Sequence, residues 1–349
     1  MKKVYVGIDV GSKQCSAASI NSNGKLLDAE TFRTTEGNLI SFVARQKGEV
    51  KVLIEEGELA GWVMRTLTPH ARSVEVSDPK RNAWIAKATN KNDRIDALKL
   101  AELLRLGSYS VVYHPEEDEM AAFKIVVKQY DEASKRLARV KCQIKARLRA
   151  QGIITRETAV YGKSGREKAL AQVKNPHVRR AIERDFELLD YLSRDKACAR
   201  REVLMMSKRF PVIERLVKIP GVGIILASRF VAIVANPNRF TKRTLAKYSR
   251  LGIVKRISDG SSLGSEHIDK AGNGKLKDLS RKVFERAIAM KRPNGIKEFY
   301  EASKRRTGSE DSARLNTQRK ILAIMLAIWR DGTEYSDELV VGKRAFAHA

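Results

Sequence analysis

The chain has 349 residues, and its 68 lysines and arginines against 41 aspartates and glutamates give a formal net charge of +27. So large a positive charge predicts an anionic partner, and because Lys and Arg run through the whole chain instead of gathering on one amphipathic helix, nucleic acid is favoured over a membrane surface. A hydrophobic content of 43% excludes a disordered basic tail, an aromatic content of 6% disfavours a large all-β sandwich, and the length suggests two domains.

The first part of the chain is predicted to form a mixed sheet covered by helices. Short β-rich apolar runs come first, and further strands then alternate with helices. This order indicates an antiparallel meander that continues into an α/β pattern. The predicted strands span 3–10, 14–20, 25–32, 51–55 and 73–76, and the predicted helices span 38–46 and 61–68.

A long helical arm is predicted to follow. From Phe123 onward, apolar residues recur at alternating steps of three and four, which is the heptad spacing of a coiled coil. The seam consists of Phe123, Val126, Tyr130, Ala133, Leu137, Val140 and Ile144. A second helical stretch, 178–208, is expected to return as the partner helix, and the more irregular segment 152–175 is expected to connect the two.

The same arm carries a run of positive charge without any acidic residue inside it. The cations are Lys135, Arg136, Arg139, Lys141, Lys145, Arg147 and Arg149. A solvated helix face is the simplest interpretation of an isolated charge run. Uncompensated cations repel one another, however, and in so basic a protein we favour contacts with nucleic-acid phosphates.

The C-terminal part is predicted to be mainly helical. Pro220-Gly221-Val222-Gly223 precedes a predicted helix at 224–235, and this pattern is typical of a helix-hairpin-helix element. The glycines Gly221 and Gly223 let a tight turn present backbone N–H groups to a DNA phosphate, although the same four residues also form ordinary turns. Basic residues nearby that favour DNA binding are Arg239, Lys242 and Arg243. The other predicted elements are a loop at 252–274 and helices at 276–290 and 315–329.

Acidic residues near the predicted strands indicate a metal site. Asp9 lies inside an apolar strand, where a carboxylate needs a partner or a cation. Glu55 ends a later strand beside Glu56, and Asp93 and Asp96 share one face at the start of the next long helix. Asp9, one of the two glutamates and the aspartate pair would suit two Mg²⁺ ions about 3.5–4 Å apart. Taken singly, each acid has a structural alternative: a turn aspartate, a solvated strand end, or a helix cap.

Other classes of site find less support. Cys15, Cys142 and Cys198 lie far apart, and with five scattered histidines they form neither a disulfide framework nor a zinc pattern. The opening GIDVGS is also similar to that of actin-like ATPases, but the further glycine-rich phosphate loops of that class are missing from the sequence. No apolar run is long enough to span a bilayer, so we expect a cytosolic protein without a membrane partner.

Several motifs together resemble the insertion-sequence 110 family of transposases, which are relatives of the Piv-type DNA invertases. In the first half the resemblance rests on Gly7-Ile8-Asp9-Val10-Gly11, on Glu55, and on Asn92-Asp93-Arg94-Ile95-Asp96. In the second half it rests on Ile219-Pro220-Gly221-Val222-Gly223 and Asp269-Lys270-Ala271-Gly272-Asn273. The resemblance covers nearly the whole chain.

This resemblance implies an α/β plus α fold. A RuvC-like domain of the RNase H type is joined by a coiled-coil arm to a mainly helical C-terminal domain that carries a nucleophilic serine. The implied boundaries are 1–112, 113–210 and 211–335, with a tail at 336–349. In the family an acidic tetrad binds Mg²⁺ near the scissile phosphate. The tetrad maps onto Asp9, Glu55, Asp93 and Asp96.

The resemblance also places the serine in the segment 256–262. Ser258 best fits the family's Ser-Asp-Gly signature, whereas an ungapped alignment puts Asp259 at the nucleophile's place and leaves Ser261 and Ser262 as other candidates. Activated by a base or a metal, such a serine would take over the phosphodiester as a protein–DNA ester.

Family members work as tetramers built from dimers, with composite sites, and a noncoding bridge RNA selects donor and target DNA by base pairing. We therefore expect a site-specific DNA recombinase of the transposase type that needs Mg²⁺, binds double-stranded DNA and a bridge RNA, acts as a dimer of dimers, and works on the nucleoid. Two alternatives remain. One is a RuvC-like structure-selective endonuclease with water as its nucleophile, and the other is a non-catalytic nucleic-acid-binding protein.

Overall fold

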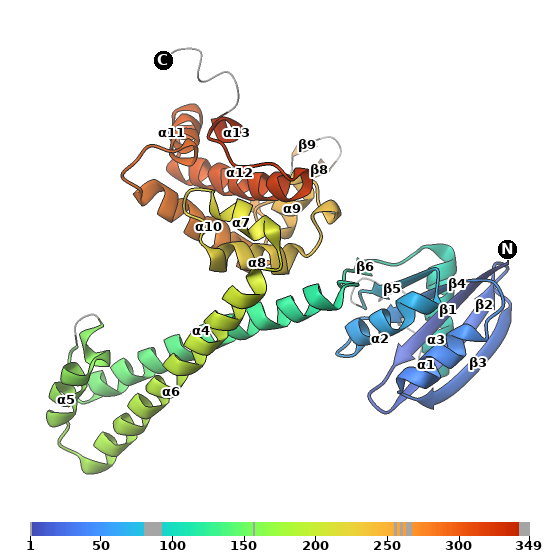
Figure 1. Ribbon diagram of the computed structural model, residues 1–349, viewed down its shortest axis with the longest axis horizontal. Helices are drawn as coiled ribbons and strands as arrows, with labels where there is room; N and C mark the ends of the chain where they lie inside the picture. Colours follow the sequence, from blue (N-terminus) through green and yellow to red (C-terminus); the bar gives the residue numbers. More distant parts are fainter. Residues whose placement is uncertain are drawn as a thin grey trace. The chain divides into compact units, whose positions relative to one another are not determined.

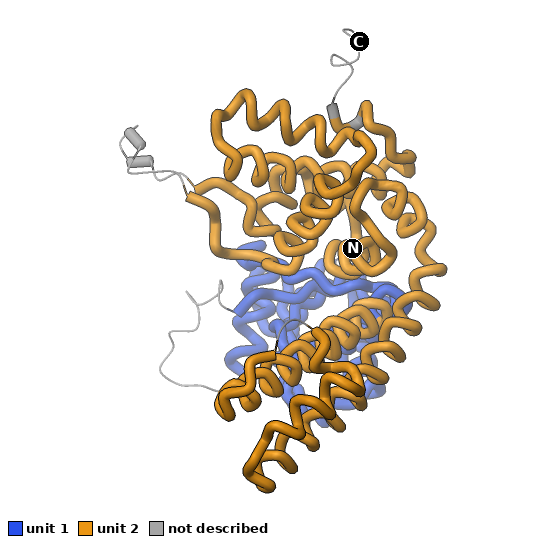
Figure 2. Tube along the Cα trace, turned by 90° about the vertical axis from the view of Figure 1, so that its left-hand side faces the viewer, with its two compact units in different colours: residues 1–121 blue, residues 122–349 orange. Residues whose placement is uncertain are grey.

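The computed structural model describes residues 2–79, 93–155, 158–254, 257–258, 261–262 and 267–341. The chain forms two compact units, 1–121 and 122–349, which Figure 2 distinguishes by colour. The first unit is built on a six-stranded sheet, and the second consists mainly of helices. The predicted C-terminal domain and all but the first nine residues of the predicted arm, 113–210, fall within the second unit. The division of arm and C-terminal domain at residue 210 stays a prediction.

The sheet has the strand order β3-β2-β1-β4-β5-β6 (Figure 1). β1, β2 and β3 pair antiparallel, β1, β4 and β5 pair parallel, and β6 pairs antiparallel with the end of β5. The bounds are β1 (Lys3–Val10), β2 (Gln14–Asn21), β3 (Leu26–Arg33), β4 (Glu49–Glu55), β5 (Ser73–Ser77) and β6 (Val111–Val112). The predicted mixed sheet is confirmed; β6 was not predicted, because a strand of two residues has no recognisable periodicity.

Helices cover both faces of this sheet. The side chains of β1 and β4 alternate between the faces, so that Ile8 and Ile54 enter the core under α1 and α2, whereas Leu53 enters the core under α3. The bounds are α1 (Glu36–Ala44), α2 (Ala60–Leu67), the 3₁₀ turn η1 (Thr68–His70) and α3 (Asp93–Leu106). The face beneath α3 is the one that also carries Asp9 and Glu55.

The second unit contains the predicted helical hairpin. The second half of α4 packs against the first half of α6, and α5 closes the end of this apolar core (Figure 1). The two long helices run antiparallel, because Gln143 bonds Asp185 while Arg147 bonds Ala181, four residues earlier. The bounds are α4 (Asp118–Ala150), η2 (Ala159–Tyr161), α5 (Lys163–Ala171) and α6 (Pro176–Ser207). Among the predicted seam residues, Val126 and Tyr130 are half-buried and the other five are buried.

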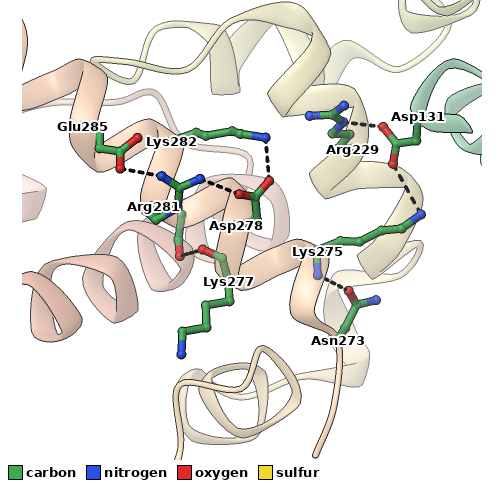
Figure 3. Close-up of polar contacts among 10 residues, drawn as sticks. Asp131, Arg229, Asn273, Lys275, Lys277, Asp278, Arg281, Lys282 and Glu285 are labelled. Atoms are coloured by element: carbon green, nitrogen blue, oxygen red, sulfur yellow. Dashed lines mark hydrogen bonds and ion pairs between the residues drawn. The ribbon is translucent and has the colours of Figure 1, made fainter. Parts of the chain in front are cut away.

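A buried ion cluster joins the hairpin to the C-terminal helices (Figure 3). Asp131 of α4, whose side chain is only 10% exposed, accepts a 2.6 Å hydrogen bond from Arg229 of α8 and lies 3.3 Å from the ammonium group of Lys275 of α10. A buried carboxylate needs such partners, because desolvation without them would cost several kcal/mol. The cluster therefore fixes α4 against α8 and α10.

The C-terminal helices are grouped around α12. Its buried side chains include Ile321, Leu322 and Met325, and it packs on α7, α9, α10, α11 and α13. The bounds are α7 (Pro211–Val217), α8 (Ile224–Val234), η3 (Pro237–Arg239), α9 (Lys242–Tyr248), α10 (Gly274–Ala289), α11 (Gly295–Thr307), α12 (Glu310–Asp331) and α13 (Glu338–Val341). α11 was not predicted. Among the described residues, no helix is long and apolar enough to cross a membrane.

Candidate functional site

Asp9 and Glu55 occupy matching positions on two adjacent parallel strands. The pairing of β1 with β4 runs from Lys3 opposite Glu49 to Ile8 opposite Ile54. Asp9 and Glu55 are the next residues of their strands, and side chains alternate between the two faces of a sheet. Both therefore leave the sheet at its carboxyl edge, on the face opposite the Ile8 and Ile54 side chains.

α3 brings its first turn to the same edge. Gly7 of β1 lies against Ala97 and Ala101, while Arg105, near the end of α3, lies close enough to Tyr5 to interact with it electrostatically. α3 therefore runs opposite to β1, and its start faces the end of β1 that carries Asp9. Asp93 and Asp96, the two aspartates predicted as metal ligands, belong to this first turn of α3.

The surroundings of these acids differ. Asp9 is half-buried, Glu55 is exposed, and Asp96 is half-buried with its carboxylate 2.9 Å from the ammonium group of Lys99. Glu56 lies beyond the strand, and its carboxylate contacts Nε2 of His114 at 2.6 Å. This contact gives Glu56 a structural partner, whereas Glu55 continues the strand face of Leu53. The side chain of Asp93 lies outside the described residues.

The donor set at this edge consists of carboxylate oxygens, which are the ligands preferred by Mg²⁺ and other hard divalent cations. The described side chains contain no group of three His, Cys, Asp or Glu residues close enough to hold a metal. The side chain of Asp93, the fourth member of the predicted tetrad, is not among these described side chains. The chemistry of the donors fits a divalent cation.

The candidate serines lie in one short hairpin. β8 (Ile257–Ser258) pairs antiparallel with β9 (Ser261–Ser262), so that Ser258 lies opposite Ser261 and Ile257 lies opposite Ser262. The side chains of these residues, and Asp259 altogether, lie outside the described part of the chain. The hairpin occupies a segment that was expected to be a loop, and its backbone does not distinguish between the three serines.

The stem below this hairpin is held by backbone hydrogen bonds. β7 (Ile253–Val254) pairs with β10 (His267–Ile268), and two arginines fix the flanking chain. Arg250 donates to the carbonyl oxygen of Gly272 at 2.8 Å, and Arg319 of α12 donates to the carbonyl oxygen of Leu251 at 2.7 Å. These two arginines were not predicted as site residues, because a charge pattern in the sequence does not show which arginines bond backbone carbonyl groups.

Comparisons with known proteins agree with this arrangement. Residues 6–151 match a transposase family model of the DEDD type, and residues 213–301 match the model described as "Transposase IS116/IS110/IS902 family". The chain belongs to the IS110 transposase family. The acids lie within the first matched segment and the serine hairpin lies within the second.

A similar protein is the "Insertion element IS110 uncharacterized 43.6 kDa protein" of Streptomyces coelicolor. It is 30% identical to the chain over 134 residues, which is 38% of the chain. The match spans about a third of that relative, 32% of its length.

In this IS110 family member, part of the basic run on α4 stabilises the arm itself. Arg147 bonds the buried carboxylate of Asp185 at 2.5 Å, and Arg136 lies 3.7 Å from Glu132. Lys141 and Lys145 lie over the ring of Tyr161, at 4.9 and 5.6 Å from its centre. The exposed cations that have no ion-pair partner among the described residues are Lys135, Arg139 and Arg149.

The predicted helix-hairpin-helix turn lies between α7 and α8. Gly221 has a φ of +84°, and a Cβ there would lie 2.5 Å from the carbonyl oxygen of Val283, so only glycine lets this turn pack on α10. Gly223 is the N-cap of α8. Of the nearby basic residues, Arg239 donates to the carbonyl oxygen of Val234 at 3.0 Å. Lys242 and Arg243 are exposed in the first turn of α9.

Proposed function

We propose that this protein is a site-specific DNA transposase that cuts and rejoins DNA through a covalent serine–DNA intermediate. The observation that carries the proposal is the parallel register of β1 and β4. It brings Asp9 and Glu55 to one sheet edge at the start of α3, in a chain that matches both IS110 family models.

In this proposal the tetrad Asp9, Glu55, Asp93 and Asp96 holds divalent cations, with Mg²⁺ as the proposed ion. A bound Mg²⁺ would stabilise the negative charge that develops on the phosphate and lower the pKa of an attacking hydroxyl. The protein's own part is to hold the carboxylates in place. The position of Glu55 on the sheet face that also carries Asp9 supports Glu55 as the glutamate of the tetrad.

The proposed nucleophile is Ser258. Its hydroxyl oxygen forms a bond to the scissile phosphorus, the bond from phosphorus to one deoxyribose oxygen breaks, and the released oxygen takes up a proton while the serine hydroxyl loses one. The phosphoserine ester conserves the bond energy, so a hydroxyl of another DNA end can reverse the step and complete strand exchange. The backbone pairing of β8 with β9 supports this role, and so do the hydrogen bonds by which Arg250 and Arg319 hold the chain near β7 and β10.

Nucleic acid is the proposed partner of the remaining basic surface. Lys135, Arg139 and Arg149 would contact phosphates along the arm, and Lys242 and Arg243 would do so beside the hairpin turn of Gly221 and Gly223. By analogy with the family, we propose that a bridge RNA selects the DNA sites and that the active assembly is a dimer of dimers. The net charge of +27 supports binding of DNA and RNA alike.

The test is a search for DNA covalently attached to the protein. The protein is expressed with its native flanking DNA, supplied with DNA that carries the element's junction and with Mg²⁺, and analysed on a denaturing gel. We expect an adduct with the wild type and with Ser261→Ala and Ser262→Ala. We expect none with Ser258→Ala or Asp9→Asn.

A matched pair tests the glutamate assignment in the same assay. Glu55→Gln should abolish the adduct, whereas Glu56→Gln should keep it, because Glu56 has its structural contact with His114. Free cleaved ends without any adduct would instead favour a water-using nuclease, and an adduct that survives Ser258→Ala but not Ser261→Ala would move the nucleophile to Ser261.

A further inference from the structure

A donor-rich pocket lies between α10, α12 and β10. It has a volume of about 630 Å³, and its lining includes Lys277, Arg281, Arg314, Gln318 and the apolar residues Ile268 and Leu315. Ile268 belongs to β10, the strand that pairs with β7 below the serine hairpin. The pocket therefore touches the stem of the hairpin that carries the candidate nucleophile.

Among the described residues, Lys277 is the cation of this pocket for which no carboxylate partner is found. Figure 3 shows its side chain extending away from the ion network on the same helix, in which Asp278 pairs with Arg281 at 2.8 Å and with Lys282 at 2.6 Å. Lys277 is half-buried and has no carboxylate partner among the described residues. A partly desolvated ammonium group without a counter-ion favours an anionic ligand.

Gln318 supplies a second group for such a ligand. Its side chain lines the pocket although the residue is only 3% exposed. Its carbonyl oxygen lies 3.3 Å from the hydroxyl of Ser280, which also donates to the carbonyl oxygen of Lys277 at 2.9 Å. The amide nitrogen of Gln318 can donate a hydrogen bond to a ligand in the pocket. Gln318 and Lys277 together therefore favour a ligand rich in acceptor oxygens.

The other charged groups of the pocket do not reverse this preference. Arg281 bonds Asp278 and also Glu285, while Arg314 bonds Asp311 at 2.7 Å. The lining thus contains three cations against the two acids Asp278 and Asp311. With both carboxylates already engaged by arginines, the free hydrogen-bonding capacity of the pocket is that of donors.

We propose that this pocket binds a phosphodiester group of nucleic acid, with Lys277 and Gln318 as its ligands, a few nucleotides from the bond that the serine attacks. The distance follows from the chain: Ser258 pairs with Ser261 across the hairpin, Ile268 is six residues after Ser262, and an extended chain spans at most about 3.3–3.6 Å per residue. The identity of the ligand as nucleic acid rests on the proposed function, whereas the affinity for phosphate oxygens rests on the pocket itself.

The test compares substitutions that remove a pocket group with one that does not. Lys277→Gln and Gln318→Met each remove a lining group of the pocket. Lys282→Gln makes the same charge change on the same helix without removing a lining residue, and Arg281 still pairs with Asp278 in that variant. Binding of a fluorescent DNA duplex and a single strand is measured by anisotropy over a range of salt concentrations. Circular dichroism and thermal unfolding verify that each variant is folded.

If Lys277 contacts a phosphate, Lys277→Gln should reduce the magnitude of the slope of log affinity against log salt concentration by about 0.9 for a duplex. Near 0.1 M salt this change corresponds to a loss of about eightfold in affinity. Gln318→Met should weaken binding without changing this slope, because it removes no charge. Lys282→Gln should leave the slope unchanged. Equal slopes for Lys277→Gln and Lys282→Gln would overturn the proposal.

Inorganic phosphate separates this proposal from the proposed function. If the wild type binds no nucleic acid, the transposase proposal fails, but millimolar phosphate should still raise the unfolding temperature of the wild type and of Lys282→Gln and not that of Lys277→Gln. If phosphate stabilises all three proteins equally, the pocket proposal fails on its own. If phosphate competes with DNA only in proteins that retain Lys277, both proposals are supported.

Discussion

The close approach of α3 to β1 at Gly7 provides a sharp test of how the acidic site is positioned. In Gly7→Ala the new Cβ would lie 2.1 Å from the carbonyl oxygen of Ala97 and 2.4 Å from the amide nitrogen of Ala101. A relaxed carbon–oxygen contact is about 3.3 Å, so α3 must move away from the sheet by about 1 Å. Both contacts are with helix backbone, and no side-chain rotation can relieve them.

Two losses follow from this displacement. Overpacking of a core typically costs about 1–3 kcal/mol. Moving α3 away from the sheet also loosens the apolar cluster of Leu53, Leu100, Leu103 and Leu104. We therefore expect the free energy of unfolding to fall by about 3 kcal/mol. The same movement shifts Asp96 relative to Asp9. A displacement of about 1 Å near a reacting centre can cost about 10²-fold in rate.

The matched control is Gly57→Ala, because a Cβ at Gly57 meets nothing within 4 Å. Urea unfolding followed by circular dichroism gives the stability of each variant, and the Mg²⁺-dependent DNA adduct, measured at a temperature where Gly7→Ala is still folded, gives its activity. Equal stability of the two variants would refute the close packing of α3. A destabilised Gly7→Ala that forms the adduct at the wild-type rate would show that α3 does not position the reactive carboxylates.

Three further predictions concern the second unit. Asp131→Asn should lower the free energy of unfolding in urea by about 2–3 kcal/mol, because the partner Arg229 then lacks a carboxylate. The control Glu187→Gln, at an exposed position, should change the free energy of unfolding by less than about 0.5 kcal/mol. Gly221→Ala should cost about 3 kcal/mol in the same measurement, because it combines a left-handed φ of +84° with a 2.5 Å backbone contact. Hydrogen bonds from Arg166 lower the pKa of Asp190, so this ion pair stabilises the protein above pH ~4 and loses that contribution as the pH falls through the lowered value. Asp190→Asn should therefore flatten the acid side of the stability profile, by less than about 1 kcal/mol because the side chain is 46% exposed.

Periodicity made much of the fold predictable. The heptad seam from Phe123 to Ile144 anticipated α4, and the alternating apolar runs anticipated β1 to β5, because burial on one face imposes a local spacing. The helices α5, α9, α11 and α13 and the strands of two residues were not predicted. A strand of two residues carries no periodicity.

Charge alone was a weaker guide. The cations from Lys135 to Arg149 look alike in sequence, yet Arg147 bonds Asp185 on the returning helix while Arg139 is exposed. The partner of Arg147 lies 38 residues away, so its role depends on how the hairpin closes. Likewise, nothing local to Lys277 or Gln318 indicates that α10 and α12 leave a pocket between them.

The sequence by itself determined most of the longer strand and helix segments, the basic character of the surface, and the residue types that a divalent cation and a phosphodiester require. Tertiary structure decided which of those residues meet. The parallel register of β1 and β4 places Asp9 beside Glu55, and the absence of a side chain at Gly7 lets α3 bring Asp96 to the same edge. Register and close approach depend on contacts between segments far apart in the chain, and local spacing does not encode them.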